Sequence, residues 1–218
     1  MLRPTTEDRT VKEDQMNSAR MDSAIKSGSG SMTSTKIVVA GSFGVGKTTF
    51  VNAVSDINPL TTEAVMTVKS DLIDDTGRIP YKGSTTVAMD FGRVALDKEL
   101  LLYLFGTPGQ ERFWFMWDRL VRGALGAVVL ADTRRLADSF SSIDFFENRN
   151  IPYVVGVNTF DGILHHPLEH VRRAMAIDRS IPVLQCDARM RDDVRGTLLG
   201  MIEYLMSRVD KTAESSVL

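Results

Sequence analysis

The segment from Gly41 to Thr48, read as Gly-Ser-Phe-Gly-Val-Gly-Lys-Thr, limits what this chain can fold into more than any other. It fits the pattern G-x-x-x-x-G-K-[ST] and follows the β-branched run Lys36–Ala40, which is typical of a buried parallel strand. A helix is expected to begin near Lys47. Glycines at such a junction let consecutive backbone N–H groups turn inward and form an anion nest at the positive end of the helix. The segment therefore predicts a phosphate-binding loop.

The chemistry of such a loop assigns a task to each of its polar side chains. Lys47 would reach the β- and γ-phosphates of a nucleotide, and the Thr48 hydroxyl would ligate Mg²⁺. The motif alone does not separate GTPases from ATPases or kinases. We expect this part of the nucleotide site to consist of Gly41, Gly44, Gly46, Lys47, Thr48 and Thr49.

Strand and helix patterns alternate along most of the chain. This alternation predicts an α/β fold with a mostly parallel sheet and helices on both faces. Apolar residues make up 43% of the 218 residues, which is enough for one domain with a substantial core. The expected strands are 36–40, 91–96, 100–105, 127–131, 153–157 and 181–185. The expected helices start near 47 and cover 114–123, 135–148, 167–176 and 192–209, and 56–83 is expected to be a mobile loop.

Composition divides the chain and excludes several classes of protein. Residues 1–34 read as a disordered polar arm, 35–209 as the folded domain and 210–218 as a flexible tail. The net charge of −2 gives no reason to expect nucleic-acid binding, and the single cysteine, Cys186, fits a reducing compartment. The longest apolar stretch, 123–131, is too short to cross a bilayer, and there is no secretory signal or prenylation motif. We expect a cytoplasmic protein without an intrinsic membrane anchor.

A second motif, Gly106-Thr-Pro-Gly109-Gln110-Glu-Arg-Phe113, follows the strand 100–105. It resembles the switch II motif D-x-x-G-Q-E of Ras-like, Rab-like and Arf-like small GTPases. The resemblance implies that the Gly109 N–H contacts the γ-phosphate. It also implies that Gln110 orients the attacking water, a role that needs a neutral donor and acceptor.

Upstream, Thr86-Val-Ala-Met-Asp90-Phe91 resembles the switch I segment T-I-G-x-D-F of Rab-like members. By this resemblance Thr86 would close over Mg²⁺ and the γ-phosphate, with Thr85 as the adjacent alternative. The two switches together imply a Ras-like G domain, which is a P-loop NTPase fold, and Mg²⁺ as the cofactor.

One departure from the family pattern lies at Gly106, where relatives have an aspartate that holds Mg²⁺ through a water. Its loss predicts weaker metal binding or a different set of groups around the metal. The position also varies in the bacterial gliding-motility small GTPases and in the D-type GTPases of actinobacterial conservons, which these segments resemble most. That resemblance implies a roadblock-type regulatory protein as partner, and in conservons a sensor-kinase-like membrane protein that could recruit the chain to the membrane.

Asn158-Thr159-Phe160-Asp161 ends the strand 153–157 and resembles the guanine-specificity motif N-K-x-D. A carboxylate accepts hydrogen bonds from guanine N1–H and the 2-amino group, whereas adenine would leave it buried and unpaired. Asp161 is therefore the expected specificity residue, with Asn158 bracing the loop, and Thr159 replaces the usual lysine, which packs along the base. The segment Cys186-Asp187-Ala188-Arg189 resembles the S-A-K loop, and Cys186, Asp187 and Ala188 are expected at the base.

These motifs predict a molecular switch that binds GTP and GDP with Mg²⁺ and hydrolyses GTP slowly. The catalytic residues would be Gln110, Lys47 and Thr86, and the metal ligands Thr48 and Thr86. Two alternatives stay open. One is an interaction module that holds nucleotide with little or no hydrolysis, which Gly106 and Thr159 favour. The other is an ATP-using P-loop protein.

Overall fold

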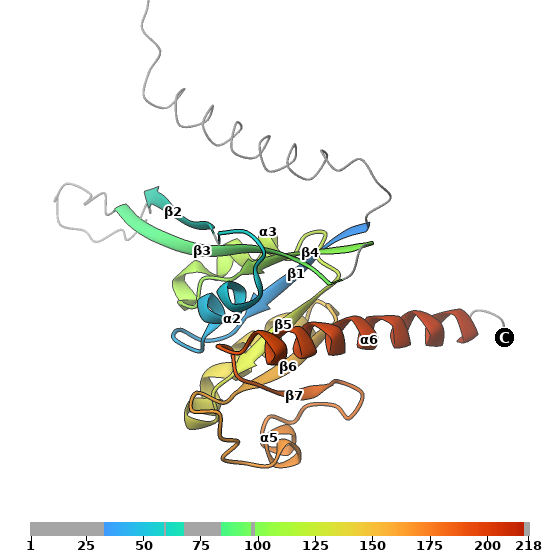
Figure 1. The fold of residues 1–218 in the computed structure, drawn as a ribbon. Helices are drawn as coiled ribbons and strands as arrows, with labels where there is room; N and C mark the ends of the chain where they lie inside the picture. Colours follow the sequence, from blue (N-terminus) through green and yellow to red (C-terminus); the bar gives the residue numbers. More distant parts are fainter. Residues whose placement is uncertain (1–32, 59, 68–83, 97–98, 216–218) are drawn as a thin grey trace, which may run out of the picture.

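The computed structural model describes residues 33–58, 60–67, 84–96 and 99–215. A seven-stranded sheet in the order β2-β3-β4-β1-β5-β6-β7 forms the centre of the molecule (Figure 1). β3 is antiparallel to β2 and β4, whereas β4, β1, β5, β6 and β7 run parallel. The strands are β1 (Thr33–Ala40), β2 (Leu60–Thr67), β3 (Ser84–Ala95), β4 (Leu100–Gly106), β5 (Gly126–Ala131), β6 (Tyr153–Asn158) and β7 (Val183–Cys186).

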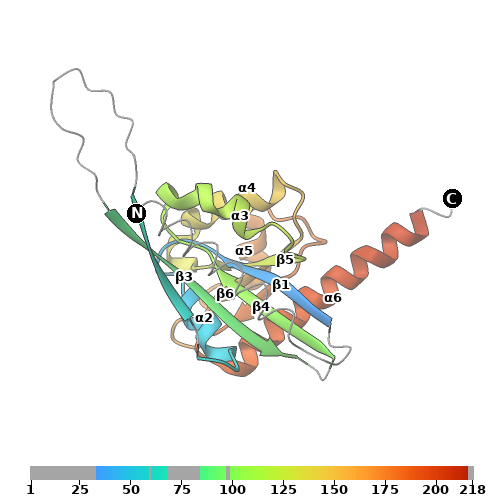
Figure 2. The same cartoon turned by 90° about the horizontal axis from the view of Figure 1, so that it is seen from above.

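Helices cover both faces of this sheet, as Figure 2 shows. One core lies under α2 (Lys47–Val54) and α6 (Arg191–Ser215), which contact each other as well as the sheet. The other lies under α3 (Trp117–Leu120), α4 (Phe140–Glu147) and α5 (Leu168–Ala174). The expected α/β architecture is confirmed.

The central strand β1 shows why the chain needs helices on both faces. Ile37 and Val39 point into the core beneath α2 and α6, and Val38 points into the opposite core. All three are fully buried. A strand that is apolar on both sides has to be covered twice, and crossover helices of parallel strands provide that cover.

Two helices begin differently from the expectation. The stretch expected as one helix from residue 114 consists of the 3₁₀ segment η1 (Glu111–Met116) followed by the single turn α3. Likewise, η2 (Thr133–Ser139) precedes α4, and Arg135 within it has the non-helical backbone angles φ −143° and ψ 51°. This break lets the Arg135 side chain turn toward the phosphate-binding loop, as described below.

Other differences concern element boundaries. β2 forms within the stretch 56–83 that was expected to be a loop, because its backbone pairs with β3 from Leu60↔Phe91 to Thr67↔Ser84. α6 continues to Ser215, so the helix extends into the expected tail 210–218. The expected arm, residues 1–34, lies outside the described residues except for its last two, which begin β1.

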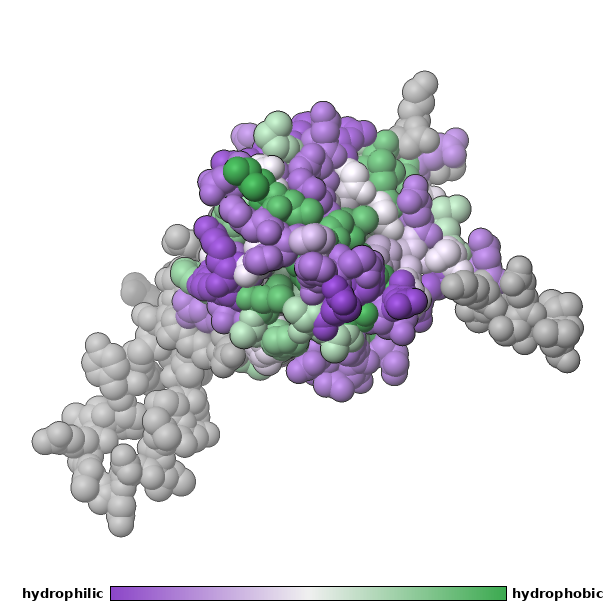
Figure 3. Space-filling view, turned by 90° about the horizontal axis from the view of Figure 1, so that it is seen from below, coloured by the Kyte–Doolittle hydropathy of each residue, from purple (hydrophilic) through white to green (hydrophobic). Residues whose placement is uncertain are grey.

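No helix in the described part of the chain combines the length and the apolar composition needed to span a membrane. Figure 3 shows the molecule from below, with hydrophilic residues over much of the surface and hydrophobic ones in smaller patches.

The order of the strands decides where a ligand site can form. β1 lies between β4 and β5, and the connection after β1 leads to β2 on one side of the sheet, whereas the connection after β5 leads to β6 and β7 on the other side. In open α/β sheets, ligands bind outside the carboxyl ends of the strands at such a switch point. The segments after β1, β4, β5, β6 and β7 all begin at this edge.

Candidate functional site

The loop between β1 and α2 has the backbone conformation that its glycines permit. Gly41, Gly44 and Gly46 have positive φ angles of 137°, 74° and 106°. A side chain at Gly41 would place its Cβ 2.6 Å from the carbonyl oxygen of Leu130, and one at Gly46 would place it 2.7 Å from Asn158 Nδ2. Gly41 and Gly46 therefore permit the left-handed backbone conformation of the loop, and their lack of a side chain lets the neighbouring strand ends approach closely.

Lys47, the first residue of α2, folds its side chain back over the loop. Its Nζ donates hydrogen bonds to the carbonyl oxygens of Gly41 (2.9 Å) and Ser42 (2.7 Å). Burial lowers the pKa of Lys47 to about 8, and the charge of Asp90 acts against this shift. A buried ammonium at the mouth of an anion nest is suited to bind phosphate oxygens.

The carboxylate expected at Gly106 comes instead from the neighbouring strand. Thr48 Oγ1 lies 2.7 Å from Asp90 Oδ2 in β3, and Asp90 is 9% exposed. A Cβ built on Gly106 would lie 3.0 Å from Asp90 Cβ and 3.1 Å from its Oδ2. Position 106 itself has no carboxylate, as the sequence shows, and Asp90 of β3 supplies one beside it. The expected effect on metal binding stays a prediction.

This pair of side chains fits a magnesium ion. Mg²⁺ prefers oxygen ligands and usually binds through one or two protein groups plus substrate phosphates and waters. The Thr48 hydroxyl and the Asp90 carboxylate supply such oxygens at the start of α2, beside Lys47. Among the described residues there is no cluster of three or more acidic, histidine or cysteine side chains that would hold a metal by itself. A metal here would depend on the nucleotide phosphates.

Thr86 lies within β3, opposite Val65 of β2, and not in a loop that precedes the strand. The strand begins at Ser84, because its pairing with β2 extends it toward the amino end. The side chain of Thr86 lies outside the described part of the structure. Its expected role at the metal stays a prediction.

The switch II motif lies directly against the phosphate-binding loop. A Cβ on Gly109 would come within 2.7 Å of Lys47 Nζ and 2.8 Å of Phe43 Cα. Gln110 follows as an exposed residue at the start of η1. Both residues line a cavity of about 570 Å³ together with the loop residue Phe43 and Phe140 of α4. The motif is thus adjacent to the place expected for a γ-phosphate.

The aromatic residues that follow Gln110 divide between core and surface. Phe113 and Trp117 are buried, and Trp117 Nε1 donates a hydrogen bond to the Pro108 carbonyl oxygen (3.2 Å). Phe115, by contrast, is 57% exposed. The buried rings fix the position of the switch II segment on the sheet, while Phe115 presents an apolar side chain beside it.

Asn158, the last residue of β6, connects two of the expected nucleotide-binding loops. Its Nδ2 donates to the carbonyl oxygen of Val45 (2.9 Å), and its Oδ1 accepts from the Ala188 N–H (3.1 Å). The side chain is only 6% exposed. Asn158 thus braces the phosphate-binding loop, and it also binds the N–H of Ala188, a residue expected at the base.

Asp161, the expected specificity residue, and Thr159, which replaces the family's lysine, differ in exposure. Asp161 is exposed, as a residue that hydrogen-bonds a base would need to be. Thr159, in place of the usual lysine, is 3% exposed and its Oγ1 has no hydrogen-bond partner. Thr159 is therefore packed under the loop and does not project along it.

The segment after β7 is built around buried groups. Cys186 is fully buried, and burial raises the pKa of its thiol to about 11. This agrees with a small core residue and not with a nucleophile. Asp187 accepts two hydrogen bonds from the Arg189 guanidinium, at 2.9 and 2.7 Å, which lowers the pKa of its carboxyl group.

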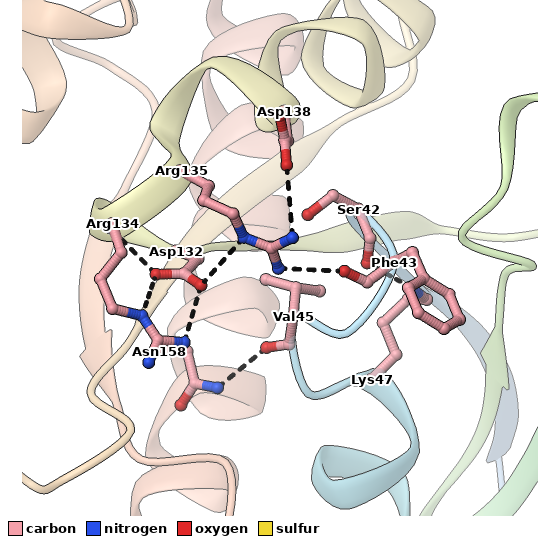
Figure 4. A network of polar contacts seen from close by, with 9 residues as sticks. All are labelled: Ser42, Phe43, Val45, Lys47, Asp132, Arg134, Arg135, Asp138 and Asn158. Carbon is pink, nitrogen blue, oxygen red and sulfur yellow. Dashed lines mark hydrogen bonds and ion pairs between the residues drawn. The ribbon is translucent and has the colours of Figure 1, made fainter.

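Sequence reasoning missed a charged network after β5, which Figure 4 shows. Asp132, 1% exposed, receives two hydrogen bonds from Arg134 at 2.9 Å and an ion pair from Arg135 at 3.8 Å. Arg135 also donates from NH2 to the Phe43 carbonyl oxygen in the phosphate-binding loop (3.2 Å). The sequence signal was an aspartate at the end of a buried strand, which marks the edge where ligands bind.

The structure thus brings the sequence-predicted residues together in two groups. The phosphate group contains the loop residues 41–48 with Asp90 and Gly109, and the base group contains Asn158, Asp161 and the segment 186–188. Asn158 joins the groups. Thr49 is exposed in the first turn of α2, and its expected place in the nucleotide site stays a prediction.

Comparisons with known proteins agree with this arrangement. The cytosolic domain of the FeoB iron transporter of T. maritima, solved in a GDP form, superposes with a TM-score of 0.58 at 17% identity. The match covers 81% of this chain and 65% of that one. The FeoB G-domain from Methanococcus jannaschii superposes with a TM-score of 0.54 at 13% identity, over 80% of this chain and 99% of that domain. The fold is therefore that of a P-loop G domain.

Sequence comparisons identify the family. Uncharacterized protein MJ1339 of Methanocaldococcus jannaschii is 34% identical over 128 residues, which are 58% of this chain and 70% of that protein. Residues 39–208 match the model of a family described as "conserved hypothetical ATP binding protein". Because this match spans most of the chain, from the end of β1 into α6, the chain belongs to that family of P-loop nucleotide-binding proteins.

Proposed function

We propose that this chain binds GTP and GDP with Mg²⁺ and acts as a molecular switch that hydrolyses GTP slowly. The observation that carries the proposal is the position of Asn158, bonded to the phosphate-binding loop on one side and to Ala188 on the other. Asp161 follows Asn158 by three residues and is exposed, which supports a role in contacting a base attached to loop-bound phosphates. A carboxylate there matches the N1–H and 2-amino donors of guanine.

Hydrolysis is the finer part of the proposal. Gly109 next to Lys47, with Gln110 following, supports a water-positioning role for Gln110. Lys47 would offset the negative charge of the phosphates, and the Thr48–Asp90 pair would hold Mg²⁺. Without an activator, an intrinsic rate on the order of 10⁻⁴–10⁻² s⁻¹ is expected for such a site. The γ-phosphate would order the switches, which hydrolysis then releases.

The test is a titration of the full chain with fluorescent GDP, GTP and ATP analogues, first with Mg²⁺ and then with EDTA. Tight guanine binding that weakens in EDTA supports the proposal. The variant Asp161→Asn should lose affinity for GTP and gain affinity for xanthosine triphosphate, because the 2-oxo group of xanthine needs a donor. A base preference that Asp161→Asn leaves unchanged would contradict the assignment.

ATP binding is the second candidate, because the family description names ATP. The loop and Lys47 serve either nucleotide, and Thr159 removes one feature of the guanine motif. Tighter binding of the ATP analogue in the same titration would establish this candidate. Binding of guanine nucleotides without phosphate release over hours would instead favour the interaction module.

The partners proposed for the switch rest on the sequence resemblance to the conservon and gliding-motility types. They are a roadblock-type regulatory protein and a sensor-kinase-like membrane protein, with the chain in the cytoplasm or recruited to the membrane by the latter. Exposed Phe115, beside the switch II motif, is an apolar side chain that such a partner could cover. Loss of roadblock binding in Phe115→Ala, with nucleotide affinity kept, would support this surface.

A further inference from the structure

In the N-K-x-D motif that residues 158–161 resemble, the lysine packs along the nucleotide base. Thr159 stands in its place and cannot do so. Thr159 is 3% exposed, and its backbone N–H is bonded to the Cys186 carbonyl oxygen at 2.9 Å. Its side chain is short and lies under the loop. If the site binds a purine nucleotide, the base needs a wall from another segment.

The segment after β5 brings a cation to the loop that contains Thr159 and Asp161. Arg134 lies with its guanidinium carbon 3.7 Å from the centre of the Phe160 ring. Phe160 is the residue between Thr159 and Asp161, so Arg134 rests on the loop that carries the expected specificity residue. The Arg134 side chain is 56% exposed, which leaves much of the guanidinium open to a ligand.

Asp132 fixes the direction of Arg134. Its Oδ1 accepts from the Arg134 backbone N–H and from Nε, and its Oδ2 accepts from NH2, all at 2.9 Å. A bidentate carboxylate holds the planar guanidinium in one orientation, which lowers the entropy lost when it contacts a ligand. Because Asp132 is 1% exposed at the end of β5, the anchor itself is rigid.

The same arrangement, an aspartate that binds the arginine two residues later, occurs after β7, two strands away in the sheet. Asp187 follows β7 and binds Arg189 through its backbone N–H (3.0 Å), Nε (2.9 Å) and NH2 (2.7 Å). The Arg189 side chain is also 56% exposed. In the sheet, β6 lies between β5 and β7, so the loop with Asp161 lies between two Asp-x-Arg turns. Hydrogen bonding to its own aspartate raises the pKa of each arginine, and the charges of that aspartate and of Asp161 add to the rise.

We infer that Arg134, oriented by Asp132, forms one wall of the base pocket and stacks on the face of the purine, in place of the lysine that Thr159 replaces. The inference rests on the proposed nucleotide-binding function. Arginine planes stack well on flat π-systems, and this attraction does not depend on which purine is bound. Arg134 therefore contributes affinity for the base, while Asp161 selects between bases.

The test compares a ligand with a base and a ligand without one. In Arg134→Ala, GDP should bind roughly 3- to 30-fold more weakly, the loss expected for one cation–π contact. Inorganic pyrophosphate, measured by competition against fluorescent GDP, should keep its affinity within about twofold, since it lacks the stacked group. Arg179→Ala is the matched control, because Arg179 is an exposed arginine in the segment between α5 and β7. Equal losses for GDP and pyrophosphate, or no loss for GDP, would overturn the inference.

A rescue experiment tests the replacement directly. Thr159→Lys restores the family's cation, so it should recover at least about threefold of the GDP affinity lost in Arg134→Ala. In the presence of Arg134 the same substitution should give a smaller gain, because the wall is already in place. A folded double variant, checked by its unfolding temperature, that binds GDP no better than Arg134→Ala alone would overturn the replacement.

Failure of the proposed function has a different signature. If the wild-type chain prefers ADP over GDP, the guanine assignment fails, yet Arg134→Ala should still weaken ADP relative to pyrophosphate. If the wild-type chain binds GDP tightly and Arg134→Ala does too, the function stands and the inference about Arg134 is wrong.

Discussion

Thr48 Oγ1 and Asp90 Oδ2 lie 2.7 Å apart, so a hydroxyl on α2 and a carboxylate on β3 meet at the start of the phosphate-binding helix. In the small GTPases that the motifs resemble, a second carboxylate lies one strand away, at the position of Gly106. Asp90 lies against Gly106, and a Cβ built there would be 3.0 Å from Asp90 Cβ. Asp90 is therefore the carboxylate that this chain offers beside Thr48.

The first prediction concerns the Asp90 carboxylate beside Thr48. Asp90→Asn removes the negative charge beside Thr48, and the apparent Mg²⁺ affinity of the nucleotide complex should fall by about 10- to 100-fold, as for other groups that support a metal. The measurement is the dissociation rate of fluorescent GDP as a function of free Mg²⁺. Asp192→Asn, at an exposed site in α6, is the matched control.

A carboxylate swap makes the same prediction sharper. Asp90→Gly combined with Gly106→Asp should recover most of the lost Mg²⁺ dependence, because the new side chain enters the vacated space. Gly106→Asp alone places its Cβ 3.0 Å from Asp90 Cβ, so it should destabilise the fold by about 1–3 kcal/mol. A swap variant that folds but binds Mg²⁺ as poorly as Asp90→Asn would argue against a shared site.

The register of β3 and β4 explains how far sequence reasoning could reach here. The neighbouring strands 91–96 and 100–105 were predicted, and pairs such as Phe91↔Phe105 follow if they form a hairpin. Counting one pair further places Asp90 beside Gly106, so the proximity of these two positions could have been derived from the sequence. It was missed because the motifs were compared along the chain and not across the hairpin.

Other features could not be derived in this way. β2 has no strong alternating pattern, and its place in the sheet is decided by pairing with β3. Arg134 and Arg135 occupy consecutive positions in a short polar segment, and η2 has a break at Arg135. The Arg134 side chain contacts Phe160, whereas the Arg135 side chain contacts Phe43 in the phosphate-binding loop. By contrast, the phosphate-binding loop and the buried strands followed from local patterns, because glycine conformation and two-sided burial are set by nearby residues.

The second prediction concerns Asn158, which bridges Val45 and Ala188. Asn158→Ala leaves a buried carbonyl oxygen and a buried N–H without partners. The free energy of unfolding should therefore fall by about 1–3 kcal/mol for each buried group left unpaired. Urea unfolding of the nucleotide-free chain measures this loss, with Asn148→Ala at the exposed end of α4 as control. Equal stability of the two variants would contradict the bridging role.

The third prediction uses the thiol of Cys186, whose pKa burial raises to about 11. A raised pKa means that the folded state keeps its proton when the unfolded state has lost it. The thiol's contribution to stability is thus full below its ordinary pKa of 9.0 and is lost as the pH rises through about 11. Ellman's reagent at pH 8.5 should react only after unfolding in urea, whereas rapid reaction of the native chain would show an accessible thiol.

The last prediction separates binding from hydrolysis at Gln110. This residue immediately precedes η1, and its neighbour Gly109 lies against Lys47, which supports the proposed contact of Gln110 with the attacking water. Gln110→Leu keeps the size of the side chain but removes its donor and acceptor. Single-turnover phosphate release should slow at least about tenfold, while the Kd for GTP changes by less than about twofold, since water positioning acts on the chemical step. Gln185→Leu, at an exposed position of β7, is the control. An unchanged rate in Gln110→Leu would assign the water to another group, and a parallel loss of GTP affinity would make Gln110 a binding residue.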